Sequence, residues 1–327
     1  MLTFIMMFLQ LAHSQSMLNP GGPAARSISR LSWIVFVIFL VVTVVMWILI
    51  AWVAVRRRGT LQDHAPVDAE GGFSWILIGG LAVPFVVLTV VFVLNVDTLS
   101  GFPMEDGAVK PEIRVVGHQW WWEIQYLSDD PTQQFTTANE IHIPAGKMVD
   151  IELVSHDVIH SFWVPRLHGK EDLIPGQPNI IRIRADQPGT FRGQCAEYCG
   201  EEHAHMIILV VAQTPADFAA WKEKQLAPAS QPADAEGQHG EELFLSGPCA
   251  LCHAIRGTGA GGTIAPDLTH LASRQGLAAN MLDNNMANLE AWVTHAQSLK
   301  PGSKMPDLAE FTGADLRSLV AYLQELN

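Results

Sequence analysis

The apolar residues of this chain fall into two long runs near the N-terminus and into short alternating segments further along. Residues 31–55 contain no charged side chain, and neither do residues 73–96. Each run is long enough to cross the hydrocarbon core of a membrane as a helix, which takes about 20 apolar residues. The pattern therefore predicts a multidomain membrane protein with a transmembrane hairpin of two helices within residues 31–98.

The residues before the first run, 1–30, form a separate N-terminal segment. Residues 1–11 are mostly apolar, and Ala12-His13-Ser14 resembles the small-residue cleavage site of a secretory signal peptide. The positively charged start of such a signal is missing, because the first basic residue is Arg26. A possible signal peptide and a retained segment therefore both stay open.

After the second run the pattern changes to short stretches in which apolar and polar residues alternate. Four such stretches are residues 112–116, 140–143, 149–154 and 180–184, and glycine and proline separate them. Alternation with a period of two is typical of strands that bury one face. Residues 111–213 are thus predicted to form an antiparallel β-sandwich of about 100 residues.

The remaining third of the chain reads as helical. Residues 214–238 are interpreted as a short amphipathic helix followed by a linker that is rich in alanine, proline and acidic residues. A flexible linker of a dozen residues spans about 20 Å, enough to let a domain dock and undock. Residues 239–327 are predicted to form a small all-α domain, because apolar residues between Leu316 and Leu326 share one helical face.

The chain has only four cysteines, and all of them lie in motifs that suit redox metals. Cys195 and Cys199 share a short stretch with His203 and Met206, which together offer two thiolates, an imidazole and a thioether. This soft ligand set favours copper. The carbonyl of Glu197 is expected to face the same centre. A disulfide or a structural zinc site are the alternatives, although zinc has no use for the methionine.

A further ligand of this centre must come from elsewhere in the chain. His160 is the best candidate, because it stands where one strand pattern ends and another begins. Three other histidines, His118, His156 and His205, are interpreted as neighbours of the site or as surface residues rather than ligands.

The other two cysteines form the sequence Cys249-Ala-Leu-Cys252-His253. Two thiols that bond to the haem vinyl groups and a histidine for the iron make up the attachment sequence of c-type haem. A thioredoxin-type redox pair is the alternative, but no βαβ pattern surrounds it.

The haem motif also bears on membrane orientation. The loop after the first run opens with Arg56-Arg57-Arg58, which the positive-inside rule places in the cytoplasm, whereas Arg26 and Arg30 count against that orientation. Because c-type haem is expected on the oxidising side, we predict that the domains after residue 96 lie on the periplasmic side.

These motifs together resemble subunit II of haem-copper cytochrome c oxidases. The resemblance rests on the cysteine-containing stretch with Met206, on His160-Ser-Phe-Trp163, and on Gly117-His-Gln-Trp120. It covers the membrane hairpin and the β domain, and it implies that the β domain is a cupredoxin-like sandwich. With the haem motif appended, the chain is similar to the fused subunit II of caa-type oxidases.

The resemblance implies a role for each residue of the first motif. Cys195 and Cys199 would bridge the two coppers of a binuclear CuA centre, which His160, His203, Met206 and the Glu197 carbonyl would complete. The Glu197 carboxylate would help to bind magnesium at the contact with subunit I. Trp120 would be the residue through which cytochrome c delivers electrons to CuA.

The C-terminal domain is similar to class I cytochromes c. Cys249 and Cys252 would then carry haem c covalently, with His253 and Met305 as the axial ligands of the iron. The carbonyl of Pro266 is expected to orient the histidine. Met281 and Met286 are rival ligands, but both stand in sequence that reads as more helical.

The resemblance predicts an electron-transfer subunit of a respiratory oxidase in the bacterial inner membrane. Electrons would pass from haem c through CuA to subunit I, which reduces oxygen and translocates protons; subunit III, membrane lipid and a cytochrome c or other donor are the further expected partners. The predicted spans contain no histidine or charged residue, so this chain alone cannot reduce oxygen. Its formal net charge of −13 argues against nucleic acid as a partner.

One alternative function stays open at this stage, the motifs count against two others, and one further site is a candidate. The chain could be the CuA subunit of a nitric oxide reductase, which would share the hairpin and the copper motif. A membrane-anchored copper protein for assembly or sensing would need no haem, and a quinol-oxidising relative would lack the copper cysteines. Glu70, just before the second run, is a candidate for proton uptake, although its spacing to Trp75 and Pro84 departs from the usual pattern.

Overall fold

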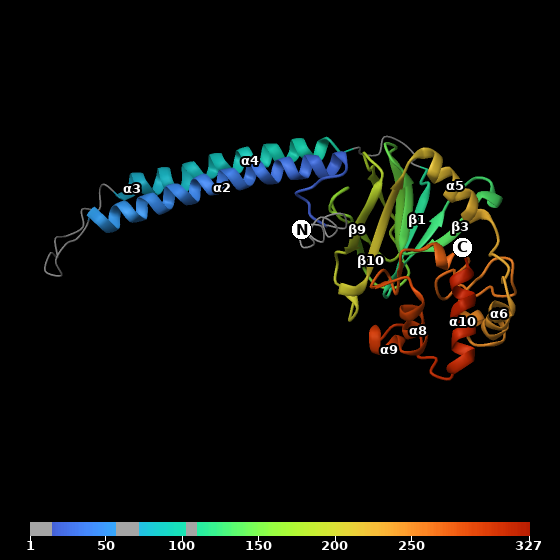
Figure 1. The fold of residues 1–327 in the computed structure, drawn as a ribbon. Helices are drawn as coiled ribbons and strands as arrows, with labels where there is room; N and C mark the ends of the chain where they lie inside the picture. The colour runs from blue at the N-terminus through green and yellow to red at the C-terminus, as the bar shows by residue number, and fades with distance from the viewer. Residues whose placement is uncertain (1–14, 57–71, 103–109) are drawn as a thin grey trace, which may run out of the picture. The chain divides into compact units, whose positions relative to one another are not determined.

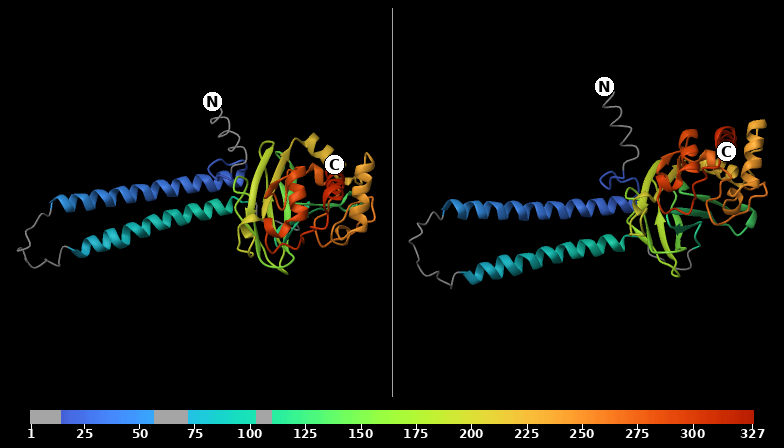
Figure 2. Two further views of the ribbon diagram at one scale, coloured as in Figure 1. Left: turned by 60° about the horizontal axis from the view of Figure 1, so that its bottom comes forward. Right: turned by 90° about the horizontal axis from the view of Figure 1, so that it is seen from below.

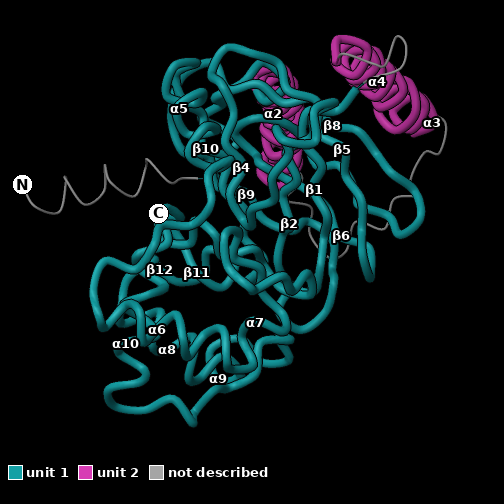
Figure 3. The backbone as a smooth tube through the Cα atoms, turned by 90° about the vertical axis from the view of Figure 1, so that its right-hand side faces the viewer, with its two compact units in different colours: residues 1–25, 107–327 teal, residues 26–106 magenta. Residues whose placement is uncertain are grey.

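The computed structural model describes residues 15–56, 72–102 and 110–327 (Figure 1). They divide into two compact units, of which one consists of residues 26–106 and the other of the rest of the chain (Figure 3). Glu70, Arg57, Arg58 and the candidate cleavage site at residues 12–14 lie outside the described residues.

The smaller unit is made of two long antiparallel helices (Figure 2). Helix α2 spans Pro23–Arg56, and the second helix runs continuously through α3 (Gly72–Trp75), η2 (Ile76–Ala82) and α4 (Val83–Ser100). Their apolar side chains are exposed on every side, which suits a lipid environment. The predicted hairpin of apolar helices is confirmed, except that α2 begins at Pro23 rather than at residue 31, because a proline is well tolerated in a first helical turn.

The second helix is widened over residues 76–82. In this π-helical segment, which contains Gly79 and Gly80, the Val83 N–H donates to the carbonyl of Ile78, five residues earlier. Pro84 follows directly and has no N–H to donate to the preceding turn. The wider turn is a way of accommodating proline within a continuous helix.

In the larger unit, residues 113–213 form a sandwich of two five-stranded sheets (Figure 1). The first sheet has the order β3-β2-β1-β5-β8 and the second β4-β10-β9-β6-β7. The strands of the first sheet are β1 (Ile113–His118), β2 (Trp121–Tyr126), β3 (Phe135–Ala138), β5 (Val149–Ser155) and β8 (Asn179–Ile183). Those of the second are β4 (Glu140–Pro144), β6 (His160–Trp163), β7 (Glu171–Leu173), β9 (Gly189–Cys195) and β10 (Ile207–Gln213).

The sandwich is confirmed, but the prediction that its strands are all antiparallel is wrong. Strand β1 pairs in parallel with β5, and β4 pairs in parallel with β10. Neither pair is joined by a hairpin, since other strands intervene along the chain. The prediction was wrong because the alternation of apolar and polar side chains carries no information on strand direction. Large side chains from both sheets, including Trp122, Ile151 and Phe162, fill the core between them.

Helix α5 (Pro215–Leu226) follows the last strand and packs on the sandwich through Phe218, Trp221 and Leu226. The Thr214 side chain accepts a hydrogen bond from the Asp217 N–H and caps the helix. The segment beyond α5, which was predicted to be a linker, contacts the domain that follows it. The Ala229 N–H donates to the Arg256 carbonyl, and the next helix already begins at residue 235.

Residues 235–327, called the helical domain here, contain α6 (Ala235–Ser246), α7 (Cys249–Cys252), α8 (Met286–Thr294), α9 (Ala296–Leu299) and α10 (Gly313–Glu325), with a hairpin of β11 (Gly276–Leu277) and β12 (Leu282–Asp283). Its first and last helices, α6 and α10, pack together (Figure 1). Gly240 permits this close approach, since a Cβ at that position would lie 2.0 Å from the Ser318 carbonyl oxygen. The predicted helical domain is confirmed, although the short hairpin of β11 and β12 means that it is not purely α.

Candidate functional site

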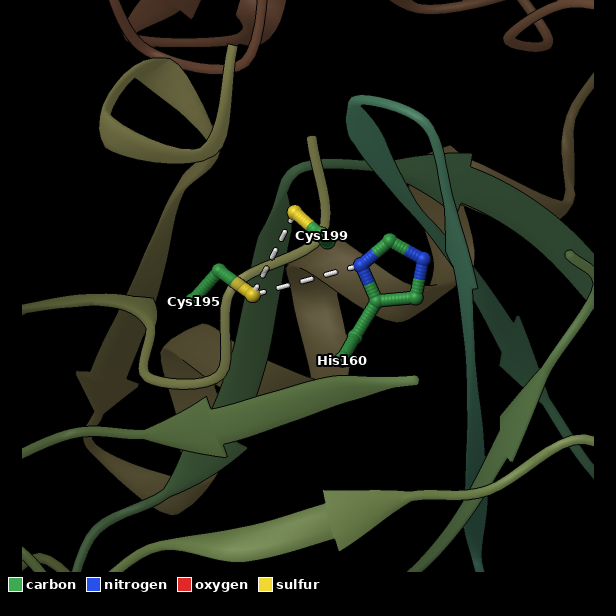
Figure 4. Close-up of side chains that lie close together, drawn as sticks. All are labelled: His160, Cys195 and Cys199. Carbon is green, nitrogen blue, oxygen red and sulfur yellow. Dashed lines mark hydrogen bonds between the residues drawn. The ribbon is translucent and has the colours of Figure 1, made fainter. Parts of the chain in front are cut away.

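Two free cysteines and a histidine form a buried cluster at one end of the sandwich (Figure 4). Cys195 ends β9 and His160 begins β6, while Cys199 lies in the loop of residues 195–206 between β9 and β10. The two Sγ atoms are 3.8 Å apart, and the Cys195 Sγ lies 3.9 Å from the His160 Nδ1. All three side chains are buried, with exposed fractions of 3% or less.

The other donors expected from the sequence surround the same two sulfurs. The Cys199 Sγ lies 3.6 Å from the His203 Nδ1 and 3.9 Å from the Met206 Sδ. The Cys195 thiol donates to the Glu197 carbonyl at 3.2 Å. The structure therefore brings together five side chains and one carbonyl, which is more than the four ligands of a structural zinc site and includes the soft donors that favour copper.

The two thiols differ in their tendency to ionise. The hydrogen bond between the two thiols, helped by His160, lowers the pKa of Cys195 from its usual value. The neighbouring Cys195 and burial raise the pKa of Cys199. Two thiolates this close together in a buried site repel each other, so ionising both requires a cation beside them.

Asp157, which was not predicted as a site residue, contacts the His160 ring at the nitrogen that does not face Cys195. The Asp157 Oδ1 lies 2.8 Å from the His160 Nε2, and this leaves the Nδ1 directed at Cys195. Although burial raises the pKa of Asp157, hydrogen bonds from His160 and from the Gln119 N–H lower it to about 2. A carboxylate that orients a ligating histidine is common in metal sites, and a signal was available in its position three residues before the histidine.

Trp120 lies directly against the 195–206 loop. Its indole Nε1 donates to the Cys199 carbonyl at 3.1 Å, and the Gln119 side chain donates to the same oxygen at 2.7 Å. Gly200 has a φ of +122°, and a Cβ there would lie 2.9 Å from the indole. The loop therefore needs glycine at this position both for its backbone conformation and for its contact with the tryptophan.

The three histidines interpreted as neighbours have other partners. His118 stacks on Trp121 with ring centroids 4.4 Å apart, and His156 lies 4.7 Å from His118. His205 pairs with the buried Glu202. The carboxylate of Glu197 contacts the Lys170 ammonium group at 3.1 Å, with both side chains about half exposed.

The second motif lines a cavity of about 290 Å³ in the helical domain. Cys249, Cys252, His253 and Met305 all face it, among mostly apolar side chains. The His253 Nδ1 lies 2.7 Å from the Pro266 carbonyl, which fixes the tautomer and leaves the Nε2 for a ligand. Two thiols, an imidazole and a thioether around an apolar cavity fit a covalently bound haem.

The rival methionines are placed differently. Met286 is 50% exposed, and neither it nor Met281 is among the described residues that line the cavity. Four residues of the sandwich, Gln119, Trp120, Trp121 and Asn139, do line it. Trp120 thus touches both the 195–206 loop and the cavity of the helical domain.

Known proteins share both parts of this chain. The family profile described as cytochrome c oxidase subunit II, periplasmic domain, matches residues 127–213, and the profile for cytochrome c matches residues 237–327. Cytochrome c oxidase subunit 2 of Alkalihalophilus pseudofirmus is 36% identical over 318 residues, which cover 94% of this chain and 90% of that protein. Cytochrome c oxidase subunit 2 of Bacillus sp. strain PS3 is 31% identical and covers 83% of this chain and 79% of its own length.

Among solved structures, the periplasmic domain of cytochrome oxidase subunit II of Bradyrhizobium japonicum is 29% identical, with a TM-score of 0.33. The matched region covers 37% of this chain and 96% of the solved chain.

The fold and its two clusters of redox-type ligands define a membrane-anchored electron-transfer protein with periplasmic domains. The chain belongs to the cytochrome c oxidase subunit II family and carries a cytochrome c domain at its C-terminus. The resemblance drawn from the sequence is confirmed. The relatives it matches over most of its length are subunits of an oxidoreductase, cytochrome c oxidase.

Proposed function

We propose that the cluster at the end of the sandwich holds a binuclear CuA centre. Cys195 and Cys199 would bridge two coppers, and His160, His203, Met206 and the Glu197 carbonyl would complete the coordination. The observation that carries the proposal is that all these donors lie 3.2–3.9 Å from one of the two buried sulfurs. Asp157 keeps the His160 ring in the orientation that a ligand requires.

The helical domain would hold haem c through thioether bonds from Cys249 and Cys252, with His253 and Met305 on the two faces of the iron. The mostly apolar lining of the cavity would keep water from a bound haem, and the Pro266 carbonyl accepts a hydrogen bond that orients the His253 ring. With both groups bound, the chain supplies a relay that takes single electrons from a donor to subunit I, which reduces oxygen and translocates protons. Trp120 is proposed as the contact between the two centres, since it borders both.

Several finer assignments belong to the same proposal. The outer face of a bacterial inner membrane is the expected location, with subunit III as a further partner and a soluble or membrane-bound cytochrome c as donor. The Glu197 carboxylate is a candidate magnesium ligand at the contact with subunit I. To bind the ion it must release Lys170, and the half-exposed ion pair makes that exchange inexpensive.

The proposal is tested on the complex purified from the membrane. Metal analysis should give copper and iron in this subunit, and the reduced spectrum should contain c-type and a-type haem bands together. Oxygen uptake should exceed consumption of nitric oxide. A complex that consumes nitric oxide and takes up no oxygen would instead be the alternative, a nitric oxide reductase with the same electron-accepting subunit.

The axial ligand can be tested separately. Met305→Ala is expected to leave haem covalently attached, because attachment depends on Cys249 and Cys252. The variant should have a haem potential lower by on the order of 0.1 V, within the range of about 0.8 V that axial ligands span, and should bind carbon monoxide. Redox titration and carbon monoxide difference spectra measure both effects. Met286→Ala, at a half-exposed position away from the cavity, is the control; if it or Met281→Ala gives these changes instead, the ligand assignment is wrong.

A further inference from the structure

A buried lysine joins the helical domain to the sandwich. Lys300 follows α9 and is only 2% exposed. Its ammonium group donates to three carbonyl oxygens, those of Trp120 at 2.8 Å, His205 at 2.9 Å and Ala278 at 3.0 Å. A lysine has three N–H donors, so every one of them is used.

These three carbonyls come from functionally distinct segments. Trp120 lies in the turn between β1 and β2, and His205 lies in the 195–206 loop, between the proposed ligands His203 and Met206. Ala278 belongs to the helical domain itself, where it borders the cavity. A single cation therefore ties together the proposed electron contact, the loop of the proposed copper ligands and the wall of the proposed haem site.

The segment that contains Ala278 is shaped to fit against the sandwich. Residues 278–280 are three consecutive non-glycine residues with positive φ, between 53° and 61°. Such a run is uncommon for residues with a side chain. The Asn280 side chain donates to the Asn139 carbonyl at 2.8 Å, and the Ile207 N–H donates to the Ala279 carbonyl at 3.3 Å.

A buried acid makes the reciprocal contact from the sandwich side. Glu140 is 3% exposed, and its Oε1 accepts hydrogen bonds from the Gln275 and Gly276 N–H groups of the helical domain. Lys300 and Glu140 are thus charged side chains of opposite sign, each of which binds the backbone of the other domain. Hydrogen bonds to charged groups are stronger and more directional than contacts between apolar surfaces.

Burying a charged lysine costs free energy of desolvation. This cost indicates that Lys300 does more than hold the two domains together. Burial lowers the pKa of Lys300 to about 8, although the nearby Glu202 raises it. Apolar side chains of similar volume often stabilise an interface as well or better than a buried charge. What the charge adds is geometry, because the three carbonyls are satisfied together in one relative orientation of the two domains.

We propose that Lys300 is a positioning residue that holds the helical domain in one orientation on the 195–206 loop, so that electrons pass from haem to copper across a fixed contact at Trp120. This proposal rests on the proposed relay from haem c to CuA. Without the lysine, the domain would sample other orientations, and transfer would wait for the productive one. The rate then falls in proportion to the population of that orientation.

The test uses the full-length protein with both centres loaded. Haem c is reduced by a light pulse, and the appearance of reduced copper is followed in the near infrared. Lys300→Met should slow transfer by about tenfold, which corresponds to ~1.4 kcal/mol of docking free energy. Added glycerol should slow the variant further but not the native protein, because domain motion becomes limiting only in the variant. Lys224→Met, at an exposed lysine of α5, removes the same charge as a matched control and should transfer at the native rate.

Each outcome decides between distinct conclusions. Native rates in Lys300→Met, with no effect of glycerol, overturn the positioning role and leave the relay intact. No transfer from haem to copper in the native protein overturns the relay itself. If Lys300→Met loses haem or copper, Glu140→Gln is the deciding variant. Slower, glycerol-dependent transfer with native spectra in Glu140→Gln supports the proposal that charged contacts fix the docked orientation. An unchanged transfer rate in that variant overturns the proposal.

Discussion

Replacing Cys199 with serine is expected to abolish the binuclear copper centre and leave haem c in place. The Cys199 Sγ is within 3.9 Å of three other proposed donors, Cys195, His203 and Met206, so its loss removes the shared bridge rather than one terminal ligand. A serine hydroxyl is a hard and weakly acidic ligand that cannot replace a soft thiolate for copper. Copper content and the near-infrared absorption of the full chain should both fall to near zero, while the c-type haem bands keep their intensity.

Tyr198→Phe is the matched control for this experiment. Tyr198 is the neighbouring residue of the same loop, and its side chain is 76% exposed. The variant should keep the full copper content. Native copper stoichiometry in the serine variant would contradict the assignment of the centre to this loop.

Ending the chain after Leu226 is expected to remove the helical domain without unfolding the sandwich. The buried residues form two separate clusters, one in each domain, and α5 belongs to that of the sandwich through Phe218, Trp221 and Leu226. The truncated subunit should therefore insert into the membrane and bind copper. Oxygen uptake from a small artificial reductant should fall by about tenfold or more, because a tethered donor has an effective concentration on the order of millimolar.

Soluble cytochrome c gives the second readout of the same experiment. In the intact chain Trp120 and Trp121 line the cavity of the helical domain, so the domain itself covers this face. Truncation uncovers it, and added cytochrome c should restore part of the oxygen uptake in the truncated complex. If truncation leaves the uptake from the artificial reductant unchanged, the helical domain is not where electrons arrive, and the relay must be abandoned.

The copper and haem motifs could be predicted because their residues are close in sequence and chemically unusual. Cys195, Cys199, His203 and Met206 lie within one loop, and that spacing has few other physical purposes. Asp157 was missed because a single acidic residue near a histidine is common in loops. Strand direction was missed for another reason: side-chain alternation reports which face is buried, and it is the same for parallel and antiparallel neighbours.

The contact between the two domains is the part that no local pattern indicates. Lys300 stands in a stretch whose glycine and prolines read as an ordinary loop, and its partners Trp120 and His205 are 180 and 95 residues away in sequence. The order of the segment after α5 was missed similarly. Its composition is typical of a flexible linker, but the Ala229 N–H and the Ala227 carbonyl both bind the helical domain. The composition of a segment predicts its flexibility only when no other part of the protein contacts it.

The pairing of Lys300 with backbone oxygens also bears on how such a chain could gain or lose a domain. Two of its three acceptors, the carbonyls of Trp120 and His205, belong to the sandwich, and in an isolated sandwich water could satisfy both. Glu140, whose Oε2 lies 3.7 Å from the Nε2 of His142 in the same strand, would likewise be hydrated. The helical domain therefore replaces water at polar groups whose hydrogen bonds water can satisfy when the domain is absent. The sandwich is self-sufficient, and the domain attached to it can be exchanged.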